Sequence, residues 1–411
     1  MLDSFFKRDF LTHKQLNALR LYKYKAMDRS FISNYILKHY WNWCVQFFPM
    51  SMAPNLITLT GLFFMVFNVL VTILFVPDLN DTTTDNHRWV YFSYAAGLWL
   101  YSTFDNVDGK QARRTGTSSP LGELFDHGCD AINCSFAAIL EASALGLGHS
   151  KASVILYGMA MLGFYLSTAE EYHTGILYLG YVNAPTEGVL LSCVVFVISG
   201  MYGPSVWKLP LKEWVKRRMA SALPQIVAEM PLSHVMLSIV GFLFLFTHAP
   251  ACLYAMYKVC KKKGEPFLRT MLVQNLPIAT YITAFYFWIM SPYSILLSHH
   301  HYILFAITTG IVFGRMATKI ILAHLTQSDF PKFTVLLIPL IIGALLTNIP
   351  LFIPSLSNRP LITPKFEYLF LCGYFLFAVV AYVQWAVVVI HSFCKFLGIR
   401  CLTIPSLKKV D

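Results

Sequence analysis

Four aspartates stand at helical spacing in one part of the chain. Asp105 and Asp108 are three residues apart, and Asp126 and Asp130 are four residues apart. Residues at these spacings share one face of a helix, so two neighbouring helices can each present a pair of carboxylates. Carboxylate oxygens are the ligands that Mg²⁺ and Mn²⁺ prefer, and four carboxylates suit two ions bridged through a phosphate. The spacing predicts such a metal site; the alternative is a pair of capped, solvated helix ends.

Small and basic residues accompany the aspartates. Gly109, Ala112 and Gly122 remove side chains where a ligand or a second helix must approach closely. Glycine in a helix costs about 1 kcal/mol relative to alanine, so glycine beside the carboxylates indicates a specific need. Close helix packing is the alternative reason. Arg113 offers a bidentate guanidinium for a phosphate, and the pattern therefore predicts phosphate chemistry.

Two apolar segments, 89–113 and 120–147, are the elements that must position these side chains. The loop 115–119 between them is rich in turn-forming residues. Ser119 can cap the second helix, with Pro120 at the first helical position. A tight antiparallel hairpin of the two helices would bring the carboxylate faces together.

The composition places this hairpin in a membrane protein. The chain has 411 residues, with 32 Lys and Arg and 21 Asp and Glu. A soluble chain of this length carries roughly 100 charged residues. Hydrophobic residues make up 56%, and the mean hydropathy is +0.56. So few charges exclude a water-soluble surface and intrinsic disorder, and nine cysteines without a CxxC pair argue against a zinc module.

We predict an all-α, polytopic membrane protein with about ten transmembrane helices. Each apolar stretch is long enough, or nearly so, to cross about 30 Å of hydrocarbon. The stretches are 55–76, 89–113, 120–147, 153–172, 186–203, 232–258, 271–290, 300–325, 334–352 and 367–397. Before them, Ile32, Ile36, Tyr40, Trp43 and Phe47 form one helical stripe. The stripe predicts an interfacial amphipathic helix; an amphipathic helix packed on protein is the alternative.

The distribution of Lys and Arg sets the expected orientation. With the N-terminus in the cytosol, ten spans return the C-terminus there, and most Lys and Arg then fall in cytosolic segments. The aspartates then face the cytosol, with Lys110 and Arg114 as surface charges. The basic segment Lys208–Arg218 is the exception. It is either a second interfacial helix or a sign that the span count is off by one there.

The chain ends in a dilysine sequence. Lys408 and Lys409 resemble the cytosolic retrieval signal of endoplasmic reticulum membrane proteins, although lysine next to a span is also common by chance. We expect the endoplasmic reticulum membrane as the location, with the Golgi as the second compartment. The net charge of +11 reflects the orientation bias and contact with anionic lipid, and it gives no sign of nucleic-acid binding.

The aspartate segment resembles a known family. From Asp105 to Asp130 it reads D-x-x-D-G-x-x-A-R-x8-G-x3-D-x3-D, which is similar at every fixed position to the signature of the CDP-alcohol phosphotransferases. The stretches DGKQARR (108–114), PLGELFDHG (120–128) and PNLIT (54–58) look like the eukaryotic choline/ethanolamine phosphotransferase branch. The second half of the chain is similar to that branch only in general pattern.

The resemblance implies a reaction and a domain organisation. Phosphocholine or phosphoethanolamine would pass from CDP-choline or CDP-ethanolamine to diacylglycerol, giving phosphatidylcholine or phosphatidylethanolamine and CMP. A cytosolic N-terminal segment, 1–54, would carry the interfacial helix and precede a six-helix catalytic core, 55–258. Four additional helices, 259–397, would form a lipid chamber or a dimer interface, followed by a cytosolic tail, 398–411. A homodimer is expected.

The same resemblance assigns roles at the site. Asp105, Asp108, Asp126 and Asp130 would hold two metal ions, and Arg113 would contact the diphosphate. Asn55, with Gln111 and Glu123 as further candidates, would contact the nucleotide. The acceptor hydroxyl needs a base, for which family accounts have often chosen Asp130. If all four aspartates bind metal, His127 is the better choice, with Glu123 one turn earlier to orient it.

Other polar residues inside the apolar segments are expected mainly in structural ion pairs. They are Glu141, Glu170, Glu171, His173, Glu187, Arg315, Lys319 and His324. Arg315 and Lys319 lie one helical turn apart and need an anion, either a lipid headgroup or one of these glutamates. Two other functions remain open from the sequence: a CDP-alcohol phosphotransferase with a different acceptor, and a cation transporter that uses the four aspartates as its ion site.

Overall fold

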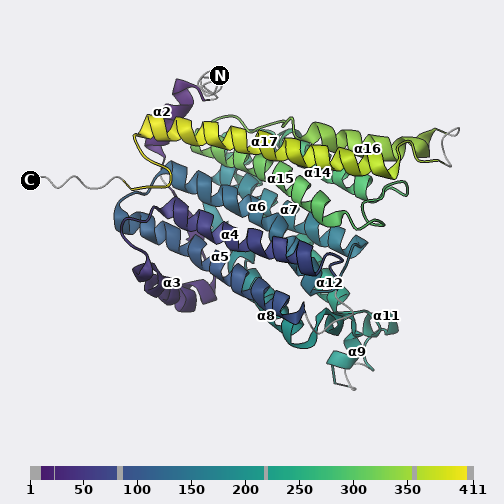
Figure 1. Cartoon of the computed structure of the whole chain (residues 1–411). Coiled ribbons are helices and arrows are strands. Elements are labelled where there is room, and N and C mark those ends of the chain that lie inside the picture. The colour runs from purple at the N-terminus through teal and green to yellow at the C-terminus, as the bar shows by residue number, and fades with distance from the viewer. Residues whose placement is uncertain (1–10, 23, 81–86, 217–220, 354–358, 405–411) are drawn as a thin grey trace, which may run out of the picture.

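The computed structural model describes residues 11–22, 24–80, 87–216, 221–353 and 359–404. A bundle of long helices makes up most of this part (Figure 1). The bundle helices are α4 (Pro54–Phe75), α5 (Arg88–Thr115), α6 (Pro120–Ala144), α7 (Lys151–Thr174), α8 (Val189–Tyr202), α12 (Leu232–Leu243), α13 (Ala249–Lys263), α14 (Phe267–Ile289), α15 (Tyr302–Leu325), α16 (Leu337–Phe352) and α17 (Pro364–Leu397). The π-turn η4 (Ala184–Gly188) leads into α8, and η6 (Phe244–His248) joins α12 to α13.

Each of the ten predicted spans therefore coincides with a helix. Within the described residues, six helices are long and apolar enough to cross a membrane. They are Pro54–Phe75, Lys151–Thr174, Ala184–Tyr202, Leu232–Lys263, Tyr302–Leu325 and Pro364–Leu397. The helix Leu337–Phe352 is apolar but shorter. The predominantly helical fold is thus confirmed, and the full count of ten spans stays a prediction.

Short elements flank the bundle. The N-terminal part holds α2 (His13–Leu21), β1 (Ala26–Asp28), η1 (Ser33–Leu37), α3 (Lys38–Cys44) and η2 (Val45–Phe47). Other short elements are β2 (Leu177–Leu179), η5 (Pro204–Lys208), α9 (Leu211–Trp214) and α11 (Gln225–Ala228). Strand β1 pairs with β2 in parallel, a small exception to the all-α expectation. This pairing fixes the N-terminal segment beside the end of α7.

The segment predicted to form the interfacial helix holds the three short consecutive elements η1, α3 and η2. Ile36, Trp43 and Phe47 are 63%, 57% and 68% exposed, which leaves an apolar stripe free to meet lipid. Tyr40 departs from the stripe because its hydroxyl accepts a hydrogen bond from the Trp99 indole at 3.1 Å. The placement of this segment, 33–47, in the membrane interface stays a prediction. The dilysine Lys408–Lys409 lies outside the described residues.

The basic segment Lys208–Arg218 is described as far as residue 216. Within that part it contains only the end of η5 and the four-residue helix α9, so it forms helical turns rather than a long interfacial helix.

The α5–α6 hairpin forms as the sequence predicts. Gly116 ends α5 with a left-handed backbone, φ +67°, which glycine adopts without steric cost. Ser119 caps α6, its hydroxyl oxygen accepting from the Gly122 amide at 3.3 Å, and Pro120 occupies the first turn. These local signals turn the chain back on itself within a few residues.

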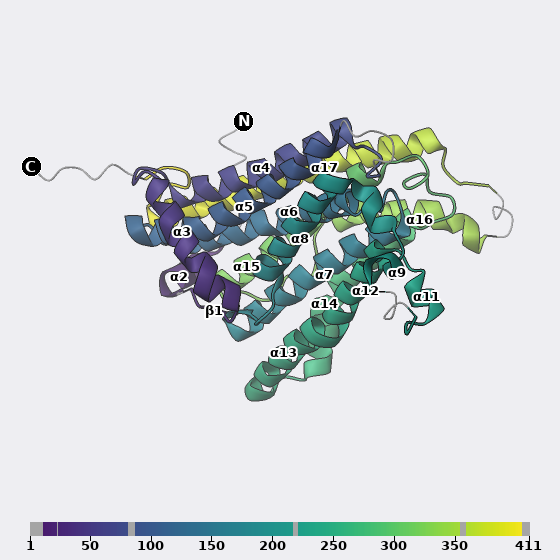
Figure 2. The same cartoon turned by 90° about the horizontal axis from the view of Figure 1, so that it is seen from below.

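Helix α15 packs directly on α6 and α7, and Figure 1 shows it in the middle of the bundle. Helix α13 also packs on α7, and in Figure 2 its far end projects below the rest of the bundle. The sequence-based division at residue 258 assigns α15 to the four additional helices. In the structure α15 packs directly against α6, a helix of the predicted catalytic core. That division stays a prediction.

Small residues permit this packing, which yields a test. A Cβ added at Gly310 of α15 would lie 2.5 Å from the Cβ of the buried Ser135 in α6. We expect Gly310→Ala to lower stability by about 1–3 kcal/mol, because overpacking a close helix contact forces the helices apart. Thermal inactivation in detergent would measure it.

Two further variants control this experiment. Gly163→Ala should be neutral or slightly stabilising, since no atom lies within 4 Å of the added Cβ. Ser135→Gly combined with Gly310→Ala should recover much of the loss. Equal stability of the Gly310→Ala and Gly163→Ala proteins would contradict the packing described.

The chain between α15 and α16 runs back along α15. Lys319 donates to the Phe333 carbonyl and Arg315 donates to the Thr334 hydroxyl, so residues 333 and 334 lie beside the last turns of α15. Helix α16 therefore begins deep in the bundle rather than at its end, and Figure 1 shows it beside only one part of α17. This return segment explains why α16 is short.

Candidate active site

The α5–α6 hairpin brings the predicted carboxylates together. Oxygen atoms of Asp105, Asp126 and Asp130 lie within 4.8 Å of one another. Asp108 adjoins this group, since it lies about one turn after Asp105 on the same face of α5. The predicted spacing therefore produces a single cluster of four carboxylates.

Neighbouring hydroxyls orient two of the four aspartates. The Thr58 hydroxyl of α4 donates a hydrogen bond to Asp108, and the Tyr101 hydroxyl of α5 donates to Asp130. Each donor leaves the second oxygen of its carboxylate available. Neither hydroxyl was predicted from the sequence, although Thr58 belongs to the PNLIT stretch.

The residues present fit a divalent metal. Asp105 Oδ1 and Asp126 Oδ1 are buried and have no hydrogen-bond partner among the described residues. Within the same part of the chain, no Lys or Arg forms a salt bridge with any of the four aspartates. Buried carboxylates without a cation are costly, and hard oxygen ligands suit Mg²⁺ or Mn²⁺. The cluster can therefore hold metal ions.

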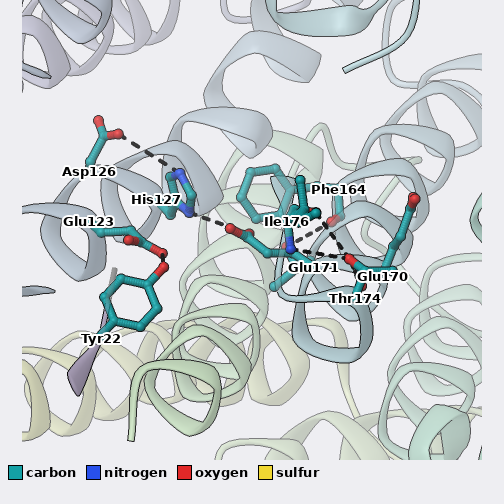
Figure 3. Close-up of polar contacts among 10 residues, drawn as sticks. Tyr22, Glu123, Asp126, His127, Phe164, Glu170, Glu171, Thr174 and Ile176 are labelled. Carbon is teal, nitrogen blue, oxygen red and sulfur yellow. Dashed lines mark hydrogen bonds and ion pairs between the residues drawn. The ribbon is translucent and has the colours of Figure 1, made fainter. Parts of the chain in front are cut away.

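His127 of α6 lies between the carboxylate cluster and α7 (Figure 3). Its Nε2 is 4.0 Å from Asp126 Oδ2, and its Nδ1 is 3.7 Å from Glu171 Oε2. The His127 side chain is only 12% exposed. One ring nitrogen thus faces the aspartates while the other faces a buried carboxylate, which is the arrangement of an oriented base.

The helical spacing suggests Glu123 as the carboxylate behind His127. In the structure Glu123 is not the sole carboxylate there, because Glu171 also faces the ring. Glu123 accepts a hydrogen bond from the Tyr22 hydroxyl at 2.6 Å, and Figure 3 shows both side chains beside His127. Burial and the Glu123 charge raise the pKa of Tyr22, so its hydroxyl stays protonated and remains a donor. The N-terminal segment thereby closes one side of the site.

Glu171 is the partner that sequence reasoning missed. The signal in the sequence is the presence of Glu170 and Glu171 within apolar α7, but for each of them the sequence favours a structural ion pair with another residue. Among the described residues, Glu171 instead pairs with His127, while nearby His173 bonds the Gln274 side chain at 2.7 Å. Only the packing of α7 against α6 reveals this role.

Glu171 therefore yields a prediction. Glu171→Gln should lower turnover on the order of tenfold or more, because the imidazolium formed on proton uptake loses its carboxylate partner. KM for the nucleotide should change little. Steady-state kinetics would measure both values. Glu170→Gln, on the same helix, is the matched control, and equal losses in the two variants would indicate damage to α7 instead.

The residues predicted to bind the nucleotide gather at the same end of the hairpin. A Cβ added at Gly122 would lie 3.8 Å from Asn55 Oδ1, and one added at Gly109 would lie 3.6 Å from an Arg113 nitrogen. Arg113 is exposed and makes no hydrogen bond or salt bridge within the described part of the chain, so it is free to meet a phosphate. Ala112, beside it, is partly buried.

Two of the residues predicted to contact the nucleotide form hydrogen bonds with other parts of the protein. The Gln111 side chain is fully buried and donates from Nε2 to the Pro49 carbonyl at 2.8 Å. Asn55 donates from Nδ2 to Cys401 Sγ at 3.5 Å, so the C-terminal segment lies beside the first turn of α4. Met52 also forms an antiparallel bridge with Thr403. No pattern in the sequence predicts this contact of the C-terminal segment with α4.

The adjacent basic residues anchor the interfacial segment. Lys110 donates to the Asn42 side chain at 2.8 Å, and Arg114 donates to the carbonyls of Val45 and Phe48 at 2.8 and 2.9 Å. Both were expected only as surface charges. They join the α5–α6 hairpin to α3 and η2, so the carboxylate cluster and the segment of η1, α3 and η2 belong to one packed unit.

Comparisons with known proteins identify similar sequences. Residues 51–215 match the family model described as CDP-alcohol phosphatidyltransferase. Choline/ethanolaminephosphotransferase 1 of Saccharomyces cerevisiae is 37% identical over 350 residues, covering 80% of this chain and 83% of that protein. Cholinephosphotransferase 1 of the same yeast is 33% identical over 352 residues, 85% and 84% of the two chains. Choline/ethanolaminephosphotransferase 1 of Arabidopsis thaliana is 33% identical over 401 residues, 94% and 96%.

Proposed function

Since this chain belongs to the CDP-alcohol phosphatidyltransferase family, we propose that it transfers phosphocholine or phosphoethanolamine from the CDP-alcohol to diacylglycerol. The chain is a transferase and a membrane protein, and the family resemblance inferred from its sequence is confirmed. The observation that carries the specific reaction is the cluster of four carboxylates beside His127, in a chain similar over most of its length to named choline/ethanolaminephosphotransferases.

The transfer breaks the phosphoanhydride bond of the CDP-alcohol and forms one new phosphoester bond, to the acceptor. The acceptor hydroxyl oxygen attacks the β-phosphorus of the CDP-alcohol, and the bond from that phosphorus to CMP breaks. Asp105, Asp108, Asp126 and Asp130 would hold Mg²⁺ or Mn²⁺, in our proposal two ions, which when bound would supply neutralising charge for the diphosphate. Arg113 binds a phosphate oxygen from the open side, and Asn55 with Gly122 borders the nucleotide.

His127 takes the proton from the attacking hydroxyl. The position of Glu171 behind the ring supports this assignment, because a carboxylate there orients the imidazole and stabilises the imidazolium. Asp130 is the alternative base. Its hydrogen bond from Tyr101 and its place in the carboxylate cluster argue for metal binding instead.

The cellular setting follows from the same proposal. We place the carboxylate cluster at the cytosolic face of the endoplasmic reticulum membrane, where a soluble CDP-alcohol can meet membrane diacylglycerol. Both termini would be cytosolic and the enzyme a homodimer. The six-helix core 55–258 with four additional helices is the proposed domain division.

A direct assay tests the function. Detergent-purified protein with Mg²⁺ or Mn²⁺ should release CMP from CDP-choline or CDP-ethanolamine only when diacylglycerol is added, with the matching phospholipid as second product. Chelation of the metal should stop the release. Diacylglycerol-independent CMP release would point to a different acceptor, and absence of metal-dependent release from any CDP-alcohol would favour the transporter reading of the aspartates.

A further inference from the structure

Arg315 and Lys319 lie one turn apart on α15 and have no anionic partner among the described residues. Arg315 donates from Nη1 to the Thr334 hydroxyl at 3.2 Å, and Lys319 donates from Nζ to the Phe333 carbonyl at 3.2 Å. Both acceptors are neutral. Two of the glutamates expected from the sequence as partners lie elsewhere: Glu171 pairs with His127, and Glu187 accepts from Ser30 and the Asn183 amide.

The two cations retain unused hydrogen-bond donors. Arginine carries five N–H donors and lysine three, and the described part of the chain provides one acceptor for each of the two side chains. Arg315 Nε is buried and has no partner within the described residues. Like charges one turn apart repel each other, and charge inside a membrane segment is costly. The local structure therefore has charge and hydrogen-bonding capacity for one more anionic group.

The surroundings of the pair combine polar and apolar groups. Arg315 stands ten residues before the end of α15, which corresponds to about 15 Å along the helix. Its guanidinium carbon is 5.7 Å from the centre of the Trp385 ring on α17. Phe333 and Val335 on the return segment are 53% and 47% exposed. A ligand here would meet two cations and an open apolar surface together.

We propose that Arg315 and Lys319 bind the phosphate group of one membrane phospholipid. Phosphate oxygens would accept from the free guanidinium donors of Arg315 and from the free donors of Lys319, which are charge-assisted hydrogen bonds. The acyl chains would lie along Phe333 and Val335. Gly314 and Thr318 of α15 face Ile132 and Gly128 of α6, so this site lies on a different face of α15 from the one that packs beside the carboxylate cluster.

Lipid titration tests the site. Delipidated wild-type protein would be titrated with phosphatidylglycerol, whose only charge is its phosphate, and binding followed by native mass spectrometry. We expect one saturable site, weakened at least about tenfold in Arg315→Gln/Lys319→Met, because the variant loses charged hydrogen bonds. Lys261→Met/Lys262→Met, in the exposed last turn of α13, is the matched control and should bind as wild type.

The outcomes separate the lipid from free phosphate. Inorganic phosphate is expected to compete poorly, since it has no acyl chain to lie on the apolar surface. Competition at equal affinity would identify a soluble phosphate site and overturn the lipid assignment. Absence of saturable wild-type binding, or equal binding by the Arg315→Gln/Lys319→Met protein, would overturn the site itself. If that double variant does not fold, Lys319→Met alone should still weaken binding, and unchanged affinity would reject the location.

Discussion

Asp126→Asn is expected to lower CMP release at least about 10³-fold. Asp126 Oδ1 is buried without a partner among the described residues, and Oδ2 lies 4.0 Å from His127 Nε2. Asp126 is therefore the member of the carboxylate cluster that also faces the proposed base. Loss of one ligand removes several kcal/mol of transition-state stabilisation, and each 1.36 kcal/mol is worth a factor of ten in rate. Steady-state CMP release with CDP-choline, diacylglycerol and Mn²⁺ would measure the change.

Metal binding gives this prediction a second readout. Mn²⁺ titration followed by electron paramagnetic resonance should show weaker or fewer bound ions in Asp126→Asn. Asp329→Asn is the matched control because that carboxylate is exposed and lies outside the cluster. Wild-type activity and wild-type Mn²⁺ binding in Asp126→Asn would exclude the cluster as the metal site.

His127→Ala is expected to lower turnover by about 10²- to 10⁴-fold, the usual contribution of a general base. Binding of CDP-choline and of Mn²⁺ should change little, because in the proposed site the nucleotide meets Asn55, Gly122 and Arg113 and the metal meets the aspartates. Single-turnover transfer and equilibrium binding of CDP-choline would separate the two effects.

The contrast with Asp130 decides the identity of the base. Asp130→Asn should lose metal binding together with turnover, whereas His127→Ala should lose turnover alone. His300→Ala, at an exposed histidine, should match wild type. Weakened nucleotide binding with intact residual chemistry in His127→Ala, or intact metal binding with lost turnover in Asp130→Asn, would transfer the role of base to Asp130.

Short-range patterns in the sequence already determined the helices and the carboxylate pairs. Apolar runs predicted ten stretches that are all helical in the structure, because helix formation depends on residues within a few turns. The spacing of Asp105 with Asp108 and of Asp126 with Asp130 fixed which side chains share a face. Ser119 and Pro120 fixed the start of α6 through local hydrogen bonding.

The partners of these residues depended on segments far away in the chain. Glu171 reaches His127 only because α7 packs on α6, and Tyr22 reaches Glu123 across 101 residues of sequence. Cys401 meets Asn55 across 346 residues. No periodicity within one segment carries information about such contacts, so sequence spacing alone suggested Glu123 as the partner of His127.

The return of residues 333 and 334 along α15 shows the same limit. The sequence established that Arg315 and Lys319 share a helix face and lack charge balance. Only the tertiary structure decided that neutral groups of Thr334 and Phe333 meet them instead of a carboxylate. Local sequence sets the backbone conformation and the face on which a side chain lies, whereas the group that meets this side chain depends on how whole helices pack together.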